Sequence, residues 1–166
     1  MTGLGQTLFP AQSRGGLLVK GESVIGARLI AQDFTGPGYF HPRASAAGKG
    51  FEANYSGATN LAASNAALVK QIADRVDVLK AENPNAKGPV PVDLATSSGS
   101  GLDPHLSPAA AAFQVEQVAA ARMVPAGEVE KLVRLHTEDR QFGFLGEPRV
   151  NVLMLNLALD ELWPMR

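Results

Sequence analysis

The residue types best suited to chemistry lie in one Gly- and Ser-rich loop, Thr96–Pro108. It holds hydroxyls, a carboxylate and an imidazole, the components of a hydrolytic triad: Ser98 or Ser100, Asp103 and His105. Triad groups must converge in space, and groups drawn from so short a stretch rarely do so. The Gly-x-Ser-x-Gly pattern is also missing, because Gly99-Ser100-Gly101 is shorter. The loop therefore favours a structural turn over a hydrolase.

The same loop leads into a helix start, which could attract an anion. Ser107 and Pro108 are typical of an N-cap and a first helical residue, where free backbone N–H groups point outward. A dinucleotide fingerprint fails because Pro104 stands where the third glycine belongs, and a phosphate loop with its lysine is absent. Either the polar side chains satisfy their own loop, or they bind a ligand or a partner. The candidate residues for the second reading are Ser97, Ser98, Gly99, Ser100, Gly101, Asp103, His105 and Gln114.

A second unusual segment, 143–152, carries two glycines and a proline before an apolar stretch with asparagines. Buried asparagine needs hydrogen-bond partners, so the segment either tethers a loop or recognises another chain. Its candidate partner-contact residues are Gly146, Glu147, Arg149 and Asn151. No metal site is expected, because the three histidines lie far apart in sequence and lack ligand spacing.

The elements that position these residues follow from hydrophobic periodicity. Two strands, 17–20 and 23–27, flank a tight turn, and a third short strand is expected over 90–95. Helical spacing predicts helices over 64–80, 108–122 and 125–136, with His136 on an apolar face. Residues 150–159 begin strand-like and end helical, whereas 34–60 predict an ordered loop packed by its own aromatic side chains. The mixture predicts a loop-rich α+β fold, a small β-sheet with about three main helices packed on it.

Composition narrows the function further. The chain has 166 residues, enough for one domain, and a net charge of −1, which gives no electrostatic basis for binding nucleic acid. The absence of cysteine excludes disulfides, thiolate catalysis and Cys-ligated zinc. The sequence has no apolar run long enough to cross a bilayer, and its first ten residues do not form a signal peptide.

Several motifs, in order, resemble one family over essentially the whole chain. They are Val24-Ile-Gly26, Tyr39-Phe-His41, the Thr96–Pro108 loop, Gln114-Val115, Val118-Ala-Ala-Ala-Arg122, Phe144–Val152 and Leu155–Asp160. The family is the C subunit (KdpC) of the high-affinity bacterial potassium pump, a four-subunit P-type ATPase. The resemblance implies one membrane helix followed by an extracytoplasmic domain. On that basis residues 1–12 are expected to be the remnant of a membrane-helix exit and linker, and 13–166 a single soluble domain.

The resemblance also implies a role. It implies a non-catalytic accessory subunit, single-pass in the plasma (inner) membrane with this domain periplasmic, that assembles the pump and assists K+ transport through the A subunit. Its expected partners are the potassium-translocating A, ATP-hydrolysing B and small F subunits. The alternative is an ATP-binding, chaperone-like subunit that raises the ATP affinity of the B subunit. ATP is thus the one ligand to consider, and no cofactor is firmly expected.

Overall fold

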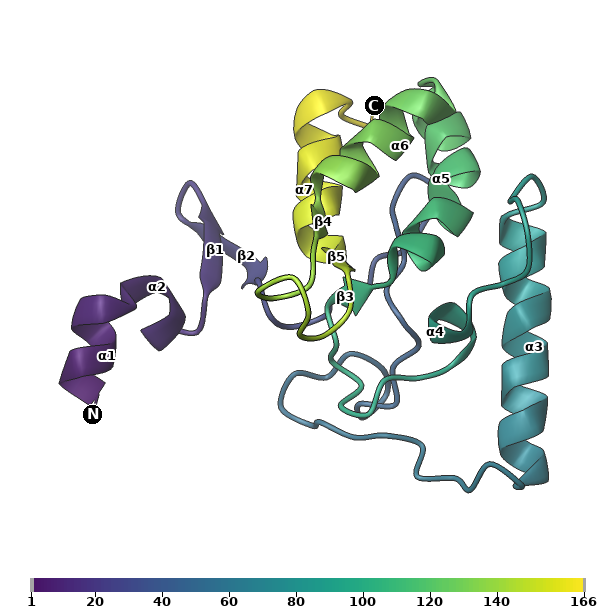
Figure 1. Ribbon diagram of the computed structural model, residues 1–166, viewed down its shortest axis with the longest axis horizontal. Coiled ribbons are helices and arrows are strands. Elements are labelled where there is room, and N and C mark those ends of the chain that lie inside the picture. The colour runs from purple at the N-terminus through teal and green to yellow at the C-terminus, as the bar shows by residue number, and fades with distance from the viewer. Residues whose placement is uncertain (1, 166) are drawn as a thin grey trace.

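The computed structural model describes residues 2–165. A main body carries the helices α5 (Pro108–Arg122), α6 (Ala126–Leu135) and α7 (Val152–Leu162) over a small sheet. A long helix, α3 (Ala66–Glu82), lies along one side, and an N-terminal arm projects from the other (Figure 1). The α+β fold class is therefore confirmed.

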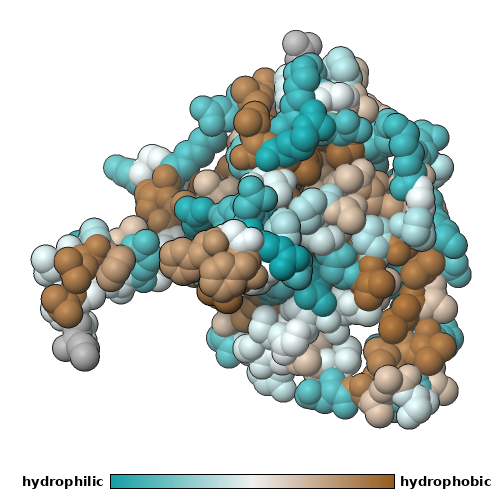
Figure 2. Space-filling view, viewed as in Figure 1, coloured by the Kyte–Doolittle hydropathy of each residue, from teal (hydrophilic) through white to brown (hydrophobic). Residues whose placement is uncertain are grey.

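The arm consists of α1 (Thr2–Leu8), α2 (Pro10–Ser13) and a hairpin of β1 (Leu17–Lys20) and β2 (Ser23–Ala27). The two strands pair antiparallel, with Leu17 opposite Ala27, as the tight turn between them predicts. Gly21 makes the turn at φ +64, a conformation that favours glycine. Both strands leave aliphatic side chains exposed, and the arm shows apolar surface in Figure 2.

The sheet of the main body has three short strands in the order β3-β5-β4, all antiparallel. They are β3 (His105–Leu106), β4 (Thr137–Glu138) and β5 (Arg149–Asn151). Because β5 is central, it joins the loop before α5 to the segment before α7, which brings the two candidate segments of the sequence together.

The predicted helices over the sheet are confirmed as α5 (Pro108–Arg122), α6 (Ala126–Leu135) and α7 (Val152–Leu162). Met123 ends α5 in the left-handed conformation at φ 57, so the chain reverses at once into α6. Buried side chains of these helices form one apolar core with Phe40, Leu94, Leu106 of β3 and Val150 of β5. The helical members are Ala110, Ala111, Phe113, Val115, Val118, Ala119, Val129, Leu132, Val133, Val152, Leu155 and Leu159.

Helix α3 (Ala66–Glu82) begins where the Asn65 side chain accepts the Ala67 N–H at 2.8 Å. Its existence is confirmed, but its burial is less than the periodicity suggests. Leu79 is its one buried residue, whereas Val69 and Val78 are more than half exposed. Figure 2 shows apolar side chains along the lower part of this helix.

The predicted strand over 90–95 is wrong. Residues Val92–Ala95 form a short helix, α4, because Pro91 provides an extended N-cap and its carbonyl accepts the Leu94 N–H at 3.1 Å. Asp93 in the first turn favours a helix start. The buried side chains of α4 are consecutive, Leu94 and Ala95, which an alternating strand would not produce.

The segment 34–60 is an ordered loop, and its aromatic packing is partial. Phe40 is fully buried, and the rings of Phe34 and Tyr39 lie 5.6 Å apart. Tyr55, in contrast, is 62% exposed and adds nothing to the core.

Candidate functional site

The Thr96–Pro108 loop ends in the predicted cap. The Ser107 hydroxyl accepts the Ala110 N–H at 3.0 Å at the start of α5. Asp93 of α4 in turn accepts the Ser107 backbone N–H at 2.8 Å and its hydroxyl at 3.2 Å. The carboxylate therefore ties α4 to the start of α5 and adds negative charge where an anion would have to bind.

Asp103 is the charged centre of the loop. Its Oδ1 accepts the His105 backbone N–H at 3.0 Å and lies 3.4 Å from the His105 ring, while its Oδ2 lies 3.4 Å from Arg43 Nη1. Burial raises the pKa of Asp103, but the hydrogen bonds from His105 and the charges of His105 and Arg43 together outweigh it and lower that pKa. Asp103 is therefore a fixed anion between two basic side chains.

Ser100 helps to satisfy the backbone of the loop. Ser98 is buried, and the Ser100 hydroxyl accepts the Leu102 N–H at 3.1 Å. Arg43 donates to the Ser97 carbonyl at 3.1 Å. Within residues 2–165 no hydrogen bond joins a serine of this loop to His105. The geometry thus holds an acid–imidazole pair without a nucleophile, and a hydrolytic triad is not assembled.

The glycines of the loop differ in their surroundings. Gly101 has φ +70, and a Cβ there would lie 2.7 Å from both the Ala47 N and the Gly57 O. Gly99 has open space around it. Only Gly101 is therefore required by the close approach of another backbone, the 45–57 segment.

Gln114 lies apart from this loop, on the buried side of α5. Its Oε1 accepts the His41 N–H at 2.8 Å, and its Nε2 donates to the His41 carbonyl at 3.1 Å. Asn156 of α7 holds Phe40 in the same way, with both bonds at 2.9 Å. The two side-chain amides thus bind the backbone N–H and C=O groups of residues 40 and 41, as a neighbouring β-strand would. The Gln114 side chain is therefore engaged in supporting the fold.

Arg122 is the important residue that the sequence reasoning missed. Its side chain is fully buried and donates to the carbonyls of Gly38 and Trp163, both at 2.6 Å, and to Asp160 at 2.8 Å. It also lies 4.8 Å from the centre of the Tyr39 ring. Helical spacing from Val115 and Val118 places position 122 on the apolar face, a signal that could have identified it.

The second candidate segment divides into structural and exposed residues. Asn151 is buried: its Oδ1 caps α7 through the Met154 N–H at 3.0 Å, and its Nδ2 donates to the Arg28 carbonyl at 2.7 Å. Gly146 adopts φ 74 in the preceding turn. Glu147 is exposed and pairs with Arg140.

Arg149 belongs to a small ion network around Glu138. Glu138 lies 2.9 Å from Arg149 and 3.1 Å from Arg28, which directly follows β2 of the arm. Burial raises the pKa of Glu138, but the two arginines outweigh it and lower that pKa. The network links the arm to β4 and β5.

The two candidate segments meet at one open groove of about 600 Å³. Asp103 and His105 line it together with Glu147 and Arg149. The remaining walls come from Arg43, Val92, Asp93, Thr96, Leu106, Ser107 and Pro148. Of the predicted loop residues, only Asp103 and His105 line the groove; Ser97, Ser98, Gly99, Ser100, Gly101, Gln114, Gly146 and Asn151 are not among its lining residues.

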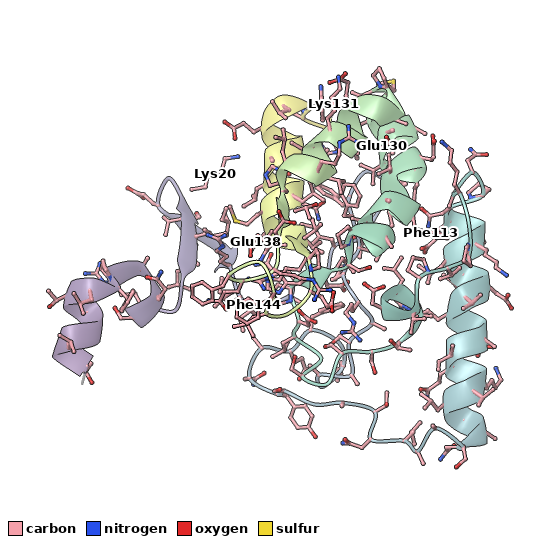
Figure 3. The ribbon with its side chains drawn as sticks, in the orientation of Figure 1. Lys20, Phe113, Glu130, Lys131, Glu138 and Phe144 are labelled. Atoms are coloured by element: carbon pink, nitrogen blue, oxygen red, sulfur yellow. The ribbon has the colours of Figure 1, made fainter. Side chains whose placement is uncertain are left out.

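An exposed apolar turn, residues 141–145, lies between β4 and β5. In the sequence it comes directly before the groove residues Glu147, Pro148 and Arg149. Gln141 and Leu145 form a bridge, and the turn presents Phe142 at 79% and Phe144 at 70% exposure. Figure 3 shows Phe144 on this turn, on the same side of the main body as Glu138. Large aromatic side chains exposed beside a charged groove are typical of an interface with another chain.

Two further properties concern residues 2–165 alone. Within them, no cluster of three or more His, Asp or Glu side chains is suited to hold a metal ion. None of the helices in this range has the length and apolar character needed to cross a bilayer.

Comparison with known proteins gives a consistent result. Residues 1–161 match the family described as "K+-transporting ATPase, c chain". The chain is 56% identical to a protein of Rhodospirillum rubrum over 165 residues, which cover 99% of this chain and 86% of that protein. It is 52% identical to a protein of Acidobacterium capsulatum over 162 residues, covering 98% and 86% of the two chains. Both relatives carry the name "Potassium-transporting ATPase KdpC subunit".

Proposed function

The chain belongs to the KdpC family of K+-transporting ATPase c chains, and from that premise we propose that it is a non-catalytic accessory subunit of the potassium pump. It assembles and stabilises the complex and assists K+ transport through the A subunit. As one of the four subunits of the pump, beside the A, B and F subunits, the chain lies at the plasma membrane under this proposal. The domain of residues 13–166 then lies on the extracytoplasmic side, and residues 1–12 lead to the membrane.

The observation that carries this proposal is the groove between the two family motifs. Its ionisable side chains are already paired within the chain, as in the contact of Asp103 with Arg43 and His105. Such paired groups are rigid, which suits recognition of another surface more than proton transfer or nucleophilic attack. The neighbouring Phe142 and Phe144 supply the apolar area that an interface needs at its centre.

We assign this face, the groove together with the 141–145 turn, to contact with the potassium-translocating A subunit. The test uses Phe142→Ser with Phe144→Ser, changes at two exposed positions that leave the core intact. Burial of each phenylalanine at an interface contributes about 1.5–3 kcal/mol. The double variant is therefore expected to lower recovery of the complex by tenfold or more when the tagged chain is coexpressed with the other subunits.

The matched control is Leu135→Ser, a change of an equally exposed apolar residue on α6. It is expected to leave complex recovery and K+ uptake unchanged. Circular dichroism and thermal melting of the isolated variants establish that both fold. Wild-type recovery and uptake with the double phenylalanine variant would show that this face is not the docking surface.

A further inference from the structure

A hollow of about 450 Å³ lies outside the groove, between helix α3 and the loop that follows β2. None of its lining residues lines the groove of the docking face, so the two sites are separate. The apolar part of its lining consists of Phe34, Pro42, Phe51, Val78 and Leu79. The basic side chains that line it include Lys49 and Arg75.

Arg75 lines this hollow with hydrogen-bond donors that the fold leaves free. Its Nε–H donates to the Leu94 carbonyl at 3.1 Å, which holds the guanidinium in place. Within residues 2–165, Nη1 and Nη2 have no acceptor, and no carboxylate oxygen lies within 4.0 Å of them. The enclosed side-chain atoms without a partner in this range are Arg43 Nε and Asn83 Oδ1, so neither Nη atom is sealed from a ligand.

The positive charge of Arg75 is incompletely compensated. Burial lowers the pKa of its guanidinium, and the negative charge of Glu82 offsets only part of that effect. Lys49 adds a second, exposed positive charge, whereas the exposed Asp33 disfavours a ligand group with two negative charges. A fixed guanidinium with free N–H groups suits an oxyanion that accepts two hydrogen bonds at once. The lining therefore favours an oxyanion with a single negative charge.

A second hollow, of about 480 Å³ and with a mainly apolar lining, adjoins the first. Asp33, Gly50 and Phe51 belong to the walls of both. The shared wall is open at Gly50, where a Cβ would have no heavy atom within 4 Å. The hairpin contributes Leu17 and Val24 to the second hollow, and both side chains are more than half exposed. A site for an oxyanion thus lies next to an uncovered apolar surface.

We propose that the two hollows together bind an amphiphile with a hydrocarbon tail and a singly charged oxyanion head, a phosphodiester or a carboxylate. The head accepts the free N–H groups of Arg75, and the tail passes Phe51 and packs on Leu17 and Val24. A small inorganic anion would leave the apolar hollow unfilled, and a neutral hydrocarbon would leave the guanidinium unpaired. The membrane that the proposed function places beside the arm is the expected source of such a molecule, although binding itself does not depend on that location.

The test is an NMR titration of the ¹⁵N-labelled 166-residue chain with octanoate and with dihexanoylphosphatidylglycerol, both below micelle-forming concentration and at constant ionic strength. We expect saturable shifts of the Arg75 Nε–H and of the Gly50, Phe51 and Val24 amides, with Kd on the order of 1 mM. Saturation by only one of the two probes would support the proposal and identify the head. Acetate has the head without the tail, and octyl glucoside has the tail without the charge. Each should bind at least tenfold more weakly than octanoate.

Variants separate the two halves of the site. Arg75→Gln should raise the Kd for octanoate at least tenfold, and Arg75→Lys, which keeps the charge but not the planar fork, at least threefold. Val24→Ser should raise it threefold or more through the tail. The matched controls are Arg134→Gln on α6 and Val19→Ser on the hairpin, exposed residues outside both hollows, which should leave the Kd unchanged. Circular dichroism establishes that each variant folds.

Equal affinities for octanoate and octyl glucoside, or for octanoate and acetate, would overturn the proposal, as would the absence of saturable shifts with both amphiphiles. An unchanged Kd in folded Arg75→Gln, or in Arg75→Lys if the glutamine variant does not fold, would also overturn it. Because the titration needs no other subunit and no membrane, its failure is distinct from a failure of the docking face to bind the pump.

Discussion

Replacing Arg122 by methionine tests how the fold holds the 38–41 segment in place. The guanidinium is fully buried and makes three hydrogen bonds, two of them to the backbone carbonyls of Gly38 and Trp163. Methionine fills much of the same volume but donates nothing. Both carbonyls and Asp160 then lose a charged donor, while Asp160 keeps the Tyr39 hydroxyl at 3.2 Å and some contact with water.

The expected magnitude follows from these contacts. Removing one partner of a buried ion pair lowers the free energy of unfolding by about 3–5 kcal/mol. Because Asp160 keeps other partners, we expect a loss of about 3 kcal/mol for Arg122→Met. With a urea m-value of roughly 2 kcal/mol/M, the unfolding midpoint should fall by about 1.5 M. Arg122→Lys should lower the free energy of unfolding by less than Arg122→Met. Lysine keeps the charge, although it cannot donate to three acceptors in the fixed directions of a guanidinium.

The assay is urea unfolding followed by circular dichroism, with hydrogen exchange of the Phe40 and His41 amides as the local measurement. Arg134→Met is the matched control, since this arginine is 65% exposed and lies 3.6 Å from Glu130. It should change the free energy of unfolding by less than about 0.5 kcal/mol. A loss below about 1 kcal/mol for Arg122→Met, with unchanged amide protection, would refute the claim that this arginine anchors the segment.

Three further predictions follow, two on the Thr96–Pro108 loop and one on the ATP-binding alternative. Gly101→Ala should lower the free energy of unfolding by about 2 kcal/mol or more, since its φ of +70 and the 2.7 Å approach of Ala47 and Gly57 leave no room, whereas Gly99→Ala should be nearly neutral in the same urea assay. The pKa of Asp103 is lowered by folding, so its carboxylate stabilises the fold above about pH 4 and this contribution is lost as the pH falls through the folded-state value. Urea midpoints measured from neutral to acid pH should therefore differ between wild type and Asp103→Asn near neutrality and converge in acid; a constant difference would contradict the ion-pair account. Calorimetry with millimolar ATP should give no heat beyond dilution, since the Gln114 amide is engaged by His41, and a saturable heat would restore the nucleotide-binding alternative.

Local patterns in the sequence predicted most of the elements. The hairpin 17–27 and the helix 108–122 were predicted correctly, because a Gly turn, an N-cap serine and a first-turn proline are all short-range signals. The strand expected over 90–95 was wrong, because an apolar run of that length does not distinguish a buried strand from a buried helical turn.

The site was harder to predict, because its contacts join distant segments. The pairing of Arg43 with Asp103 spans 60 residues, and the approach of Asp103 and Glu147 to one groove depends on β5 lying between β3 and β4. Gln114 stood out in the sequence for its family motif, yet its amide holds the backbone of His41. A polar residue on a buried helix face more often completes the fold than binds a ligand, and only the tertiary contacts show which.

The most direct test of the account is crosslinking in the assembled pump. A photo-crosslinking amino acid placed at Phe144, on the exposed 141–145 turn, should attach this chain to the potassium-translocating A subunit, as mass spectrometry of the product would show. The same amino acid at Leu135, which is 81% exposed on α6, should give no such product. An intact pump that crosslinks to the A subunit from position 135 and not from position 144 would contradict the proposed docking face.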